Sequence, residues 1–173
     1  MEAVILVLIL VGISILFVIS IRWTTRKGAP WEPTSMEKVH AMLQLARVKP
    51  GDVVIDLGCG DGRIPITAAR VYGARAVGIE IDPIRYAIAW LCVRFLGLRD
   101  LVEIRRGDIF QEDISRATVV TCYLLQDTND RLLNKFQREL SPDTRVVSNT
   151  YTFQSMVPDQ QQENLYLFII KNE

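Results

Sequence analysis

Three glycines fall within five positions in the stretch Asp56-Leu57-Gly58-Cys59-Gly60-Asp61-Gly62-Arg63. The stretch follows V-V-I at residues 53–55, a run of β-branched residues that is typical of a strand buried on both faces. Glycines permit the sharp turn by which a chain passes from such a strand into a helix. The N-terminus of that helix offers unpaired N–H groups to a ligand. The sequence therefore predicts a strand, a ligand-binding loop and a helix over residues 63–72.

Apolar runs and helical patterns alternate along the rest of the chain. Further strands are predicted at residues 76–79, 101–105, 117–125, 145–148 and 165–170. One helix is predicted from the cap Asp82 and Pro83 to about residue 96, and another from Asp127 or Thr128 to about residue 140. The alternation indicates an α/β, Rossmann-like fold with a mostly parallel sheet.

The C-terminal part of the pattern departs from this alternation. A strand-like run at residues 149–153 precedes the run at 165–170 without an intervening helix. We therefore expect an antiparallel C-terminal strand at the end of the sheet, with the glutamines at 160–162 in a loop. The domain is expected to begin at Thr34, whose hydroxyl would cap a helix, with Glu37 completing a capping box.

The N-terminal segment has a different composition. Residues 4–21 form an uncharged run of 18, which as a helix would span about 27 Å, enough for a hydrocarbon core. We expect a single transmembrane anchor at residues 1–23 and a linker at 24–33. A cleaved signal peptide and a buried core helix are the competing interpretations. Arg22, Arg26 and Lys27 follow the run, so the domain would face the cytoplasm by the positive-inside rule.

The composition limits the other function classes. The chain carries 20 basic and 20 acidic residues, so there is no global electrostatic footprint for nucleic acid. The three cysteines lack the C-x-x-C spacing of zinc sites, and the single histidine is far from them in sequence. Neither a metal site nor a disulfide framework is predicted.

The spacing within the glycine loop distinguishes two cofactor classes. In a dinucleotide fingerprint, G-x-G-x-x-G, the third glycine would stand where this chain has Arg63. Asp56, at the end of the strand, would repel a pyrophosphate. The same carboxylate would attract the sulfonium and ammonium groups of S-adenosylmethionine. A nicotinamide-dependent oxidoreductase is therefore the less favoured interpretation.

Two more acidic residues follow the next two strands. Glu80 could accept hydrogen bonds from both hydroxyls of a ribose. Asp108 could accept a hydrogen bond from an adenine amino group, with Ile109 and Phe110 packing the ring. Taken alone, Asp108 is better explained as a turn residue, but its place after the other two acidic positions favours a binding role.

These motifs resemble those of a known superfamily. The sequences D-L-G-C-G-D-G-R at 56–63, G-I-E-I-D at 78–82 and R-G-D-I-F at 106–110 resemble class I, seven-β-strand S-adenosylmethionine-dependent methyltransferases. The resemblance covers nearly all of residues 30–173. Pro33-Thr34, A-T-V-V-T at 117–121 and T-R-V-V-S at 144–148 are similar to small archaeal non-SET protein-lysine methyltransferases. Their eukaryotic relatives are membrane-associated mitochondrial enzymes acting on lysines of the ATP synthase c-subunit and the adenine nucleotide translocase.

The resemblance implies a set of site residues and a protein lysine as the substrate. The cofactor would be bound by Thr34, Asp56, Gly58, Gly60, Asp61, Glu80, Asp108 and Ile109. Thr34 would belong to a lid over the methionine carboxylate. The substrate side would be residues 123–126 and 149–153, and the hypothesis for the lysine channel is an aromatic mouth of Tyr123, Tyr151 and Phe153.

Other substrates and roles stay open. A membrane-associated small molecule or lipid could take the methyl group, and a non-catalytic, membrane-tethered S-adenosylmethionine-binding module is also possible. The chain lacks the Asn/Asp-Pro-Pro-Tyr motif of amino-group nucleic-acid methylases, so a nucleic-acid partner is not expected. The expected partners are a protein substrate and the bilayer, while the sequence does not fix an oligomeric state.

Overall fold

A computed structural model describes residues 11–12 and 32–171. The predicted anchor at 1–23 and linker at 24–33 lie almost entirely outside these residues. Within the part described, no helix has both the length and the apolar character needed to cross a membrane. Contacts divide the chain after Glu32, and the unit that begins at Pro33 contains all the elements below.

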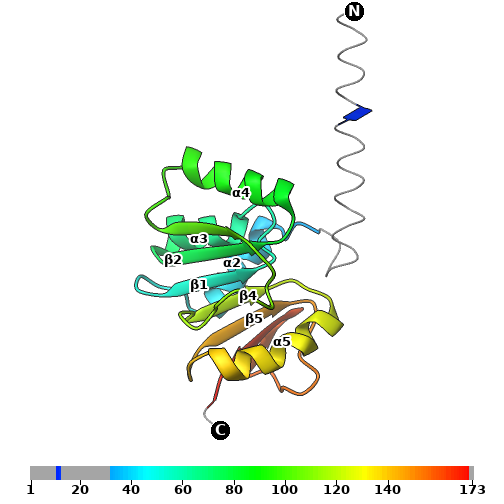
Figure 1. The fold of residues 1–173 in the computed structure, drawn as a ribbon. Helices are drawn as coiled ribbons and strands as arrows, with labels where there is room; N and C mark the ends of the chain where they lie inside the picture. Colours follow the sequence, from blue (N-terminus) through cyan, green and yellow to red (C-terminus); the bar gives the residue numbers. More distant parts are fainter. Residues whose placement is uncertain (1–10, 13–31, 172–173) are drawn as a thin grey trace, which may run out of the picture. The chain divides into compact units, whose positions relative to one another are not determined.

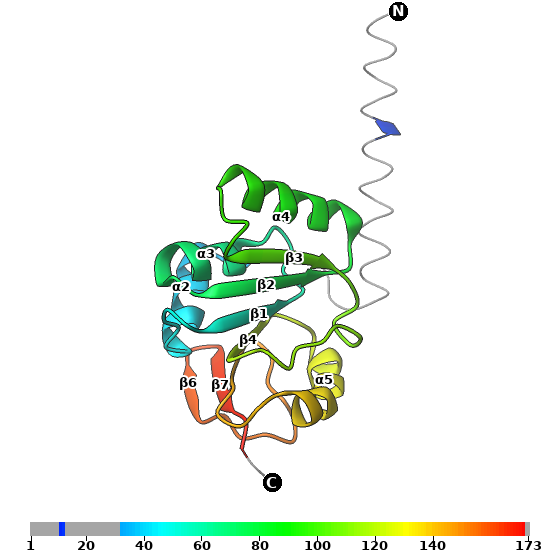
Figure 2. The same cartoon turned by 60° about the vertical axis from the view of Figure 1, so that its left-hand side comes forward.

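A single seven-stranded sheet forms the centre of this unit (Figures 1 and 2). Its strands, in sheet order, are β3 (Val102–Arg106), β2 (Arg75–Glu80), β1 (Val53–Leu57), β4 (Val119–Cys122), β5 (Arg145–Asn149), β7 (Leu165–Ile169) and β6 (Gln160–Gln162). The first five of these are parallel, and β7 runs antiparallel to both of its neighbours. The predicted Rossmann-like, mostly parallel sheet with an antiparallel C-terminal strand is confirmed.

The C-terminal part corrects two details of the prediction. β7 does not end the sheet, because the exposed residues Gln160–Gln162 form an edge strand, β6, against it. These glutamines were predicted as a loop because a solvent-exposed edge strand needs no apolar alternation. The strand-like run at 149–153 is also not a strand beyond Asn149, since Thr150 adopts a positive φ of 70° and ends β5.

Helices cover both faces of the sheet. On one face, α2 (Met36–Leu45), α3 (Arg63–Tyr72) and α4 (Pro83–Phe95) bury a core that includes Val39, Ala68 and Ala89. On the other, α5 (Gln126–Glu139) contributes Leu132 and Phe136 to a second core. Figures 1 and 2 show α5 separated from the other helices by the sheet. The carboxyl ends of the parallel strands meet at one edge, where the loops gather.

The helix caps are partly as predicted. Asp82 caps α4 by accepting hydrogen bonds from the N–H groups of Ile84 and Arg85, both at 2.9 Å. The cap of α2 is Ser35 rather than Thr34, which is buried. The predicted caps of α5 are wrong by a few residues: the helix begins directly after Leu125, without a side-chain cap.

Candidate active site

The glycine loop joins β1 to α3 and is held against β2. Gly58, Gly60 and Gly62 have φ angles of 81°, 57° and 82°, the left-handed region that favours glycine. The N–H groups of Gly58 and Cys59 both donate to the carbonyl of Ile79, at 2.9 and 3.0 Å. A Cβ at Gly62 would lie 3.1 Å from the Cβ of Ala89, so the loop packs closely on α4. The loop is therefore fixed between two strands and a helix.

Glu80 lies beneath this loop, at the carboxyl end of β2. One carboxylate oxygen accepts from the N–H of Gly60 at 2.9 Å, and the other accepts from the N–H of Asp82 at 2.8 Å. Each oxygen has a second lone pair, which can accept a hydroxyl of a ligand. The carboxylate predicted to bind a ribose is thus held in place by two backbone donors.

Asp56 lies at the end of β1 and is 3% exposed. Burial, followed by the negative charges of Glu80 and Asp61, raises its pKa to about 7, although a hydrogen bond from Thr121 opposes the shift. A buried acid with this pKa gains from a cation placed beside it. The cluster of Asp56, Asp61 and Glu80 therefore fits a positively charged ligand and disfavours a pyrophosphate.

Arg63 connects the loop to Thr34, just before α2. Its guanidinium binds both oxygens of Asp61, with Nη2 2.5 Å from Oδ2, and its Nη1 donates to the carbonyl of Thr34 at 2.6 Å. Burial alone would raise the pKa of Asp61, but its hydrogen bonds and ion pair with Arg63 hold it below its usual value. The backbone of Thr34, predicted as part of a lid, is thus tied to the glycine loop by a residue that the sequence did not single out for this role.

The turn after β3 lies beside the end of β2. The N–H of Gly107 donates to the carbonyl of Glu80 at 3.1 Å, which places the half-buried Asp108 next to the same edge. The Asp108 carboxylate accepts from the N–H of Phe110 at 3.0 Å, as a turn residue would. Ile109 and Phe110 pack against the α5-side core. Asp108 therefore has the structural role of a turn residue and a position suited to the binding role.

The three residues of the predicted aromatic mouth do not share one environment, because Phe153 is buried and the two tyrosines are half-buried. Phe153 is 1% exposed and contacts Phe136 and Phe168 edge-on, with ring centroids 5.6 and 5.0 Å away. Its ring therefore lies in the core rather than at an opening. Tyr123 and Tyr151 are half-buried, and Tyr123 directly follows β4. Because side chains alternate along a strand, Tyr123 continues the face that carries Thr121.

Side-chain amides organise the segment after β5, and their contacts have no local sequence signal. Asn129, buried in α5, donates through Nδ2 to Ser148 Oγ at 3.1 Å and to the carbonyl of Tyr151 at 3.2 Å. Asn149 is 1% exposed and accepts from Thr150 Oγ1 at 3.1 Å. Its Nδ2 has no hydrogen-bond acceptor among the residues that the structure describes. This buried donor lies at the carboxyl end of β5, next to β4.

The chain resembles proteins of one family over most of its length. A model of the "ANTKMT methyltransferase domain" matches residues 56–160. A protein-lysine N-methyltransferase of Saccharolobus islandicus is 39% identical over 150 residues, which cover 82% of this chain and 93% of that protein. The adenine nucleotide translocase lysine N-methyltransferase of Mus musculus is 33% identical over 134 residues. These span 77% of this chain but only 58% of the mouse enzyme.

A solved structure shares the fold. It is that of an RNA methyltransferase from Salinibacter ruber in complex with S-adenosyl-L-homocysteine, with a TM-score of 0.79 and 46% sequence identity. The match covers 82% of this chain and 95% of the Salinibacter chain. The relatives agree on methyl transfer and differ in the class of acceptor.

Proposed function

Since the chain belongs to the family of the ANTKMT methyltransferase domain and is an S-adenosylmethionine-dependent methyltransferase, we propose that it methylates lysine side chains of proteins. The observation that carries the cofactor assignment is the acidic cluster beneath the glycine loop. Asp56 and Glu80 are buried together at the carboxyl edge, where open α/β sheets bind ligands. The order of the parallel strands reverses between β1 and β4, and Asp56 lies on β1 beside this point.

The residues present fit the cofactor. Asp56, Gly58, Gly60 and Asp61 would hold the methionine part, Glu80 the ribose, and Asp108 with Ile109 the adenine. When bound, the cofactor supplies an electrophilic methyl group on a sulfonium, whose C–S bond breaks as the acceptor nitrogen bonds to the carbon. The contribution of the protein is positioning, because in-line displacement depends on the geometry of the two reactants.

A lysine acceptor must lose a proton before it can attack. Tyr123 and Tyr151 flank the carboxyl ends of β4 and β5, where the side chain of an acceptor would enter. We assign them the role of orienting the lysine stem. Phe153 would support this segment from the core instead of contacting the acceptor.

The Salinibacter relative supplies a second candidate, an RNA acceptor. The formal net charge of zero weakens this alternative, because a basic surface is the usual footprint of an RNA-binding protein. Residues 123–126 read Y-L-L-Q, which is not the motif of amino-group nucleic-acid methylases. Lysine is therefore the favoured acceptor, and a membrane-associated small molecule or lipid is the remaining alternative.

We further propose that the enzyme is tethered to a membrane by its N-terminal segment. The support is the uncharged run at 4–21 and the basic residues that follow it. In this arrangement, a single-pass anchor precedes a linker at 24–33, and the catalytic domain lies on the cytoplasmic side.

The acceptor class is tested by incubating the full chain with methyl-labelled S-adenosylmethionine and separated membrane-protein, soluble-protein, RNA and lipid fractions. We expect label in protein, on lysine Nζ after acid hydrolysis. A Glu80→Ala chain serves as the inactive control. Label confined to RNA or to lipid would exclude the lysine assignment and leave the methyltransferase assignment intact.

A further inference from the structure

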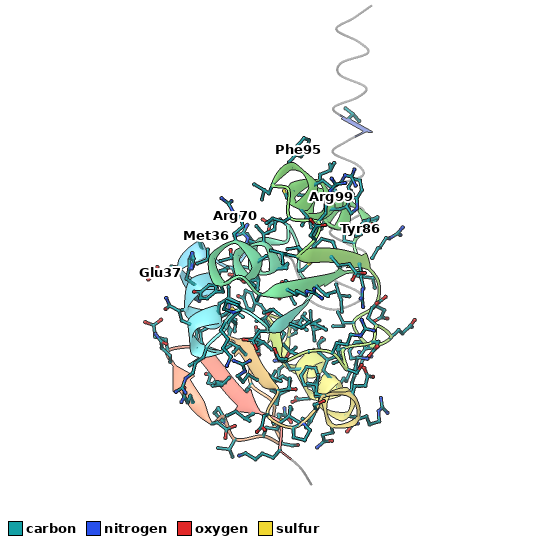
Figure 3. The ribbon with its side chains drawn as sticks, turned by 90° about the vertical axis from the view of Figure 1, so that its left-hand side faces the viewer. Met36, Glu37, Arg70, Tyr86, Phe95 and Arg99 are labelled. Atoms are coloured by element: carbon teal, nitrogen blue, oxygen red, sulfur yellow. The ribbon has the colours of Figure 1, made fainter. Side chains whose placement is uncertain are left out.

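The outer face of α4 carries large apolar side chains that the rest of the domain leaves exposed. We call them the α4 apolar stripe; they are Ile84, Ile88, Leu91 and Phe95, with exposed fractions of 42%, 46%, 45% and 86%. Their spacings of four, three and four residues place them along one side of the helix. Ala89 and Val93, which are buried in the core, lie on the opposite side. Figure 3 shows Phe95 projecting from α4 away from the domain.

The charged residues of α4 and of the turn that follows it are arginines, and the exposed carboxylates Asp100 and Glu103 come only after this stretch. Residues 83–99 contain three arginines and no aspartate or glutamate. Arg94 lies over the ring of Trp90, 4.5 Å from its centroid, and both residues are exposed. Arg99, labelled in Figure 3, is exposed just after the helix. An apolar helix face with basic and tryptophan side chains beside it is typical of helices that lie in the interface of an anionic bilayer.

We propose that the α4 apolar stripe docks on the surface of a bilayer that contains anionic lipids. Leu91 and Phe95 enter the boundary between headgroups and acyl chains. Arg94 and Arg99 bind the lipid phosphates. This contact is made by the folded domain itself and does not depend on the N-terminal run or on the identity of the methyl acceptor.

A second copy of the chain is a poorer occupant. In a two-fold dimer built on this face, stripe would pack on stripe and the arginine-bearing flanks would meet. Two carboxylates, Asp100 and Glu103, follow these arginines, but Glu103 is already paired with Arg105. Positive charge therefore remains in excess, and like charges brought together cost free energy. An anionic lipid surface supplies the missing negative charge.

The position of the stripe connects docking with the site. Ile84 follows Glu80 by four residues, so the stripe begins at the edge of the sheet that binds the cofactor. A bilayer lying along α4 would border this edge. If the proposed lysine chemistry is correct, lysines close to a membrane surface would lie near the site of the docked domain.

The test places a fluorescent probe in the stripe of the full chain. Trp23, Trp31 and Trp90 are replaced by phenylalanine, and Phe95→Trp then supplies the only tryptophan. The matched control carries Val157→Trp. Val157 is 87% exposed and precedes β6, the edge strand at the opposite end of the sheet from β3. Each protein is mixed with vesicles of phosphatidylcholine, with or without phosphatidylglycerol, whose acyl chains are brominated. Cofactor binding in solution verifies that both proteins are folded.

We expect Phe95→Trp to lose about half its emission on phosphatidylglycerol vesicles, since interfacial helices bury their apolar face roughly 5–10 Å deep. The loss should be smaller on phosphatidylcholine alone, and Val157→Trp should keep its emission on both. Equal quenching of the two probes, or none at Phe95→Trp, would overturn the proposal. A dimer detected by sedimentation and abolished by Phe95→Ser would overturn it in favour of a second copy.

Discussion

Thr121 Oγ1 donates a hydrogen bond of 2.7 Å to Asp56 Oδ1, and the two residues are paired in register between β4 and β1. This bond crosses the point at which the strand order reverses. Both residues are buried, so the acid cannot be solvated by bulk water. The protein holds an acid there with little to neutralise it, which has measurable consequences for stability and for binding.

The ligand-free protein should lose stability as the pH rises through the titration range of Asp56. Its pKa is about 7 in the folded protein, from burial and then from Glu80 and Asp61, against an ordinary value of 3.8. Between these values the folded state binds more protons than the unfolded state, so raising the pH favours unfolding. We expect a loss of about 2 kcal/mol between pH 5 and pH 7. Urea unfolding at a series of pH values measures the free energy of unfolding, and Asp56→Asn should make it depend less on pH. The same pH dependence in both proteins would contradict the raised pKa of Asp56.

Cofactor binding should release a proton near neutral pH. A cation in the site favours the ionised form of Asp56 and lowers the raised pKa. Affinity for S-adenosylmethionine should therefore increase from pH 6 to pH 8, and more steeply than for S-adenosylhomocysteine, which lacks the sulfonium charge. Calorimetric titration in buffers of different ionisation enthalpy measures the number of protons released on binding. A proton release that is unchanged in Asp56→Asn would contradict this role of Asp56.

Arg63 should contribute to cofactor affinity because it holds the glycine loop and the backbone of Thr34 together. Arg63→Ala removes the bonds to Asp61 and to the Thr34 carbonyl. In the variant, cofactor binding would have to restore the order that these charge-assisted bonds supply, about 1.5 kcal/mol, so the Kd should rise by up to roughly tenfold. Proteolysis just before α2, near Thr34, should also become faster. Arg70→Ala, an exposed arginine on the same helix, is the control, and equal effects of the two variants would refute the role.

We expect the Nδ2 of Asn149 to donate a hydrogen bond that helps to bind the methyl acceptor. The hydroxyl of Thr150 accepts from Asn164 Nδ2 at 3.2 Å and donates to Asn149 Oδ1, which fixes the orientation of the Asn149 amide. If a substrate carbonyl or water accepts from Nδ2, Asn149→Ala should lower kcat/KM for the acceptor by about tenfold, the value of one buried hydrogen bond. Cofactor affinity should not change.

The control for this prediction is Asn164→Ala, which removes a neighbouring bond and keeps the Asn149 amide. Because a buried donor without an acceptor costs stability, Asn149→Ala should leave the free energy of unfolding unchanged or raise it. An unchanged kcat/KM, measured with peptide acceptors, would show that Nδ2 has no role in substrate binding.

The placement of the candidate cofactor residues at one edge of the sheet could be predicted because their sequence signals are local. Glu80 ends a strand, the glycine loop and Asp108 each follow one, and parallel strands bring their carboxyl ends to one edge. The loop spacing and Asp56 together predicted S-adenosylmethionine rather than a dinucleotide, and the methyltransferase relatives agree with this cofactor class. Asp82 and Pro83 likewise carry a helix start within two adjacent residues.

The remainder depends on contacts between distant segments. β6 is polar and exists because β7 offers it a partner. Phe153 looks like any strand aromatic until Phe136 and Phe168 are seen to enclose it. The bonds of Asn129 to Ser148 and Tyr151, and of Arg63 to Thr34, join residues 19, 22 and 29 positions apart, so no local pattern reports them.

The most direct test of the cofactor site is calorimetric titration of the full chain with S-adenosylmethionine and, separately, with a nicotinamide dinucleotide. Glu80→Ala is titrated in parallel, because it removes the acceptor for the Gly60 N–H and for the ribose. We expect equimolar binding of S-adenosylmethionine, which Glu80→Ala weakens strongly, and no binding of the dinucleotide. Binding of the dinucleotide, or S-adenosylmethionine affinity that is the same in Glu80→Ala, would contradict this expectation.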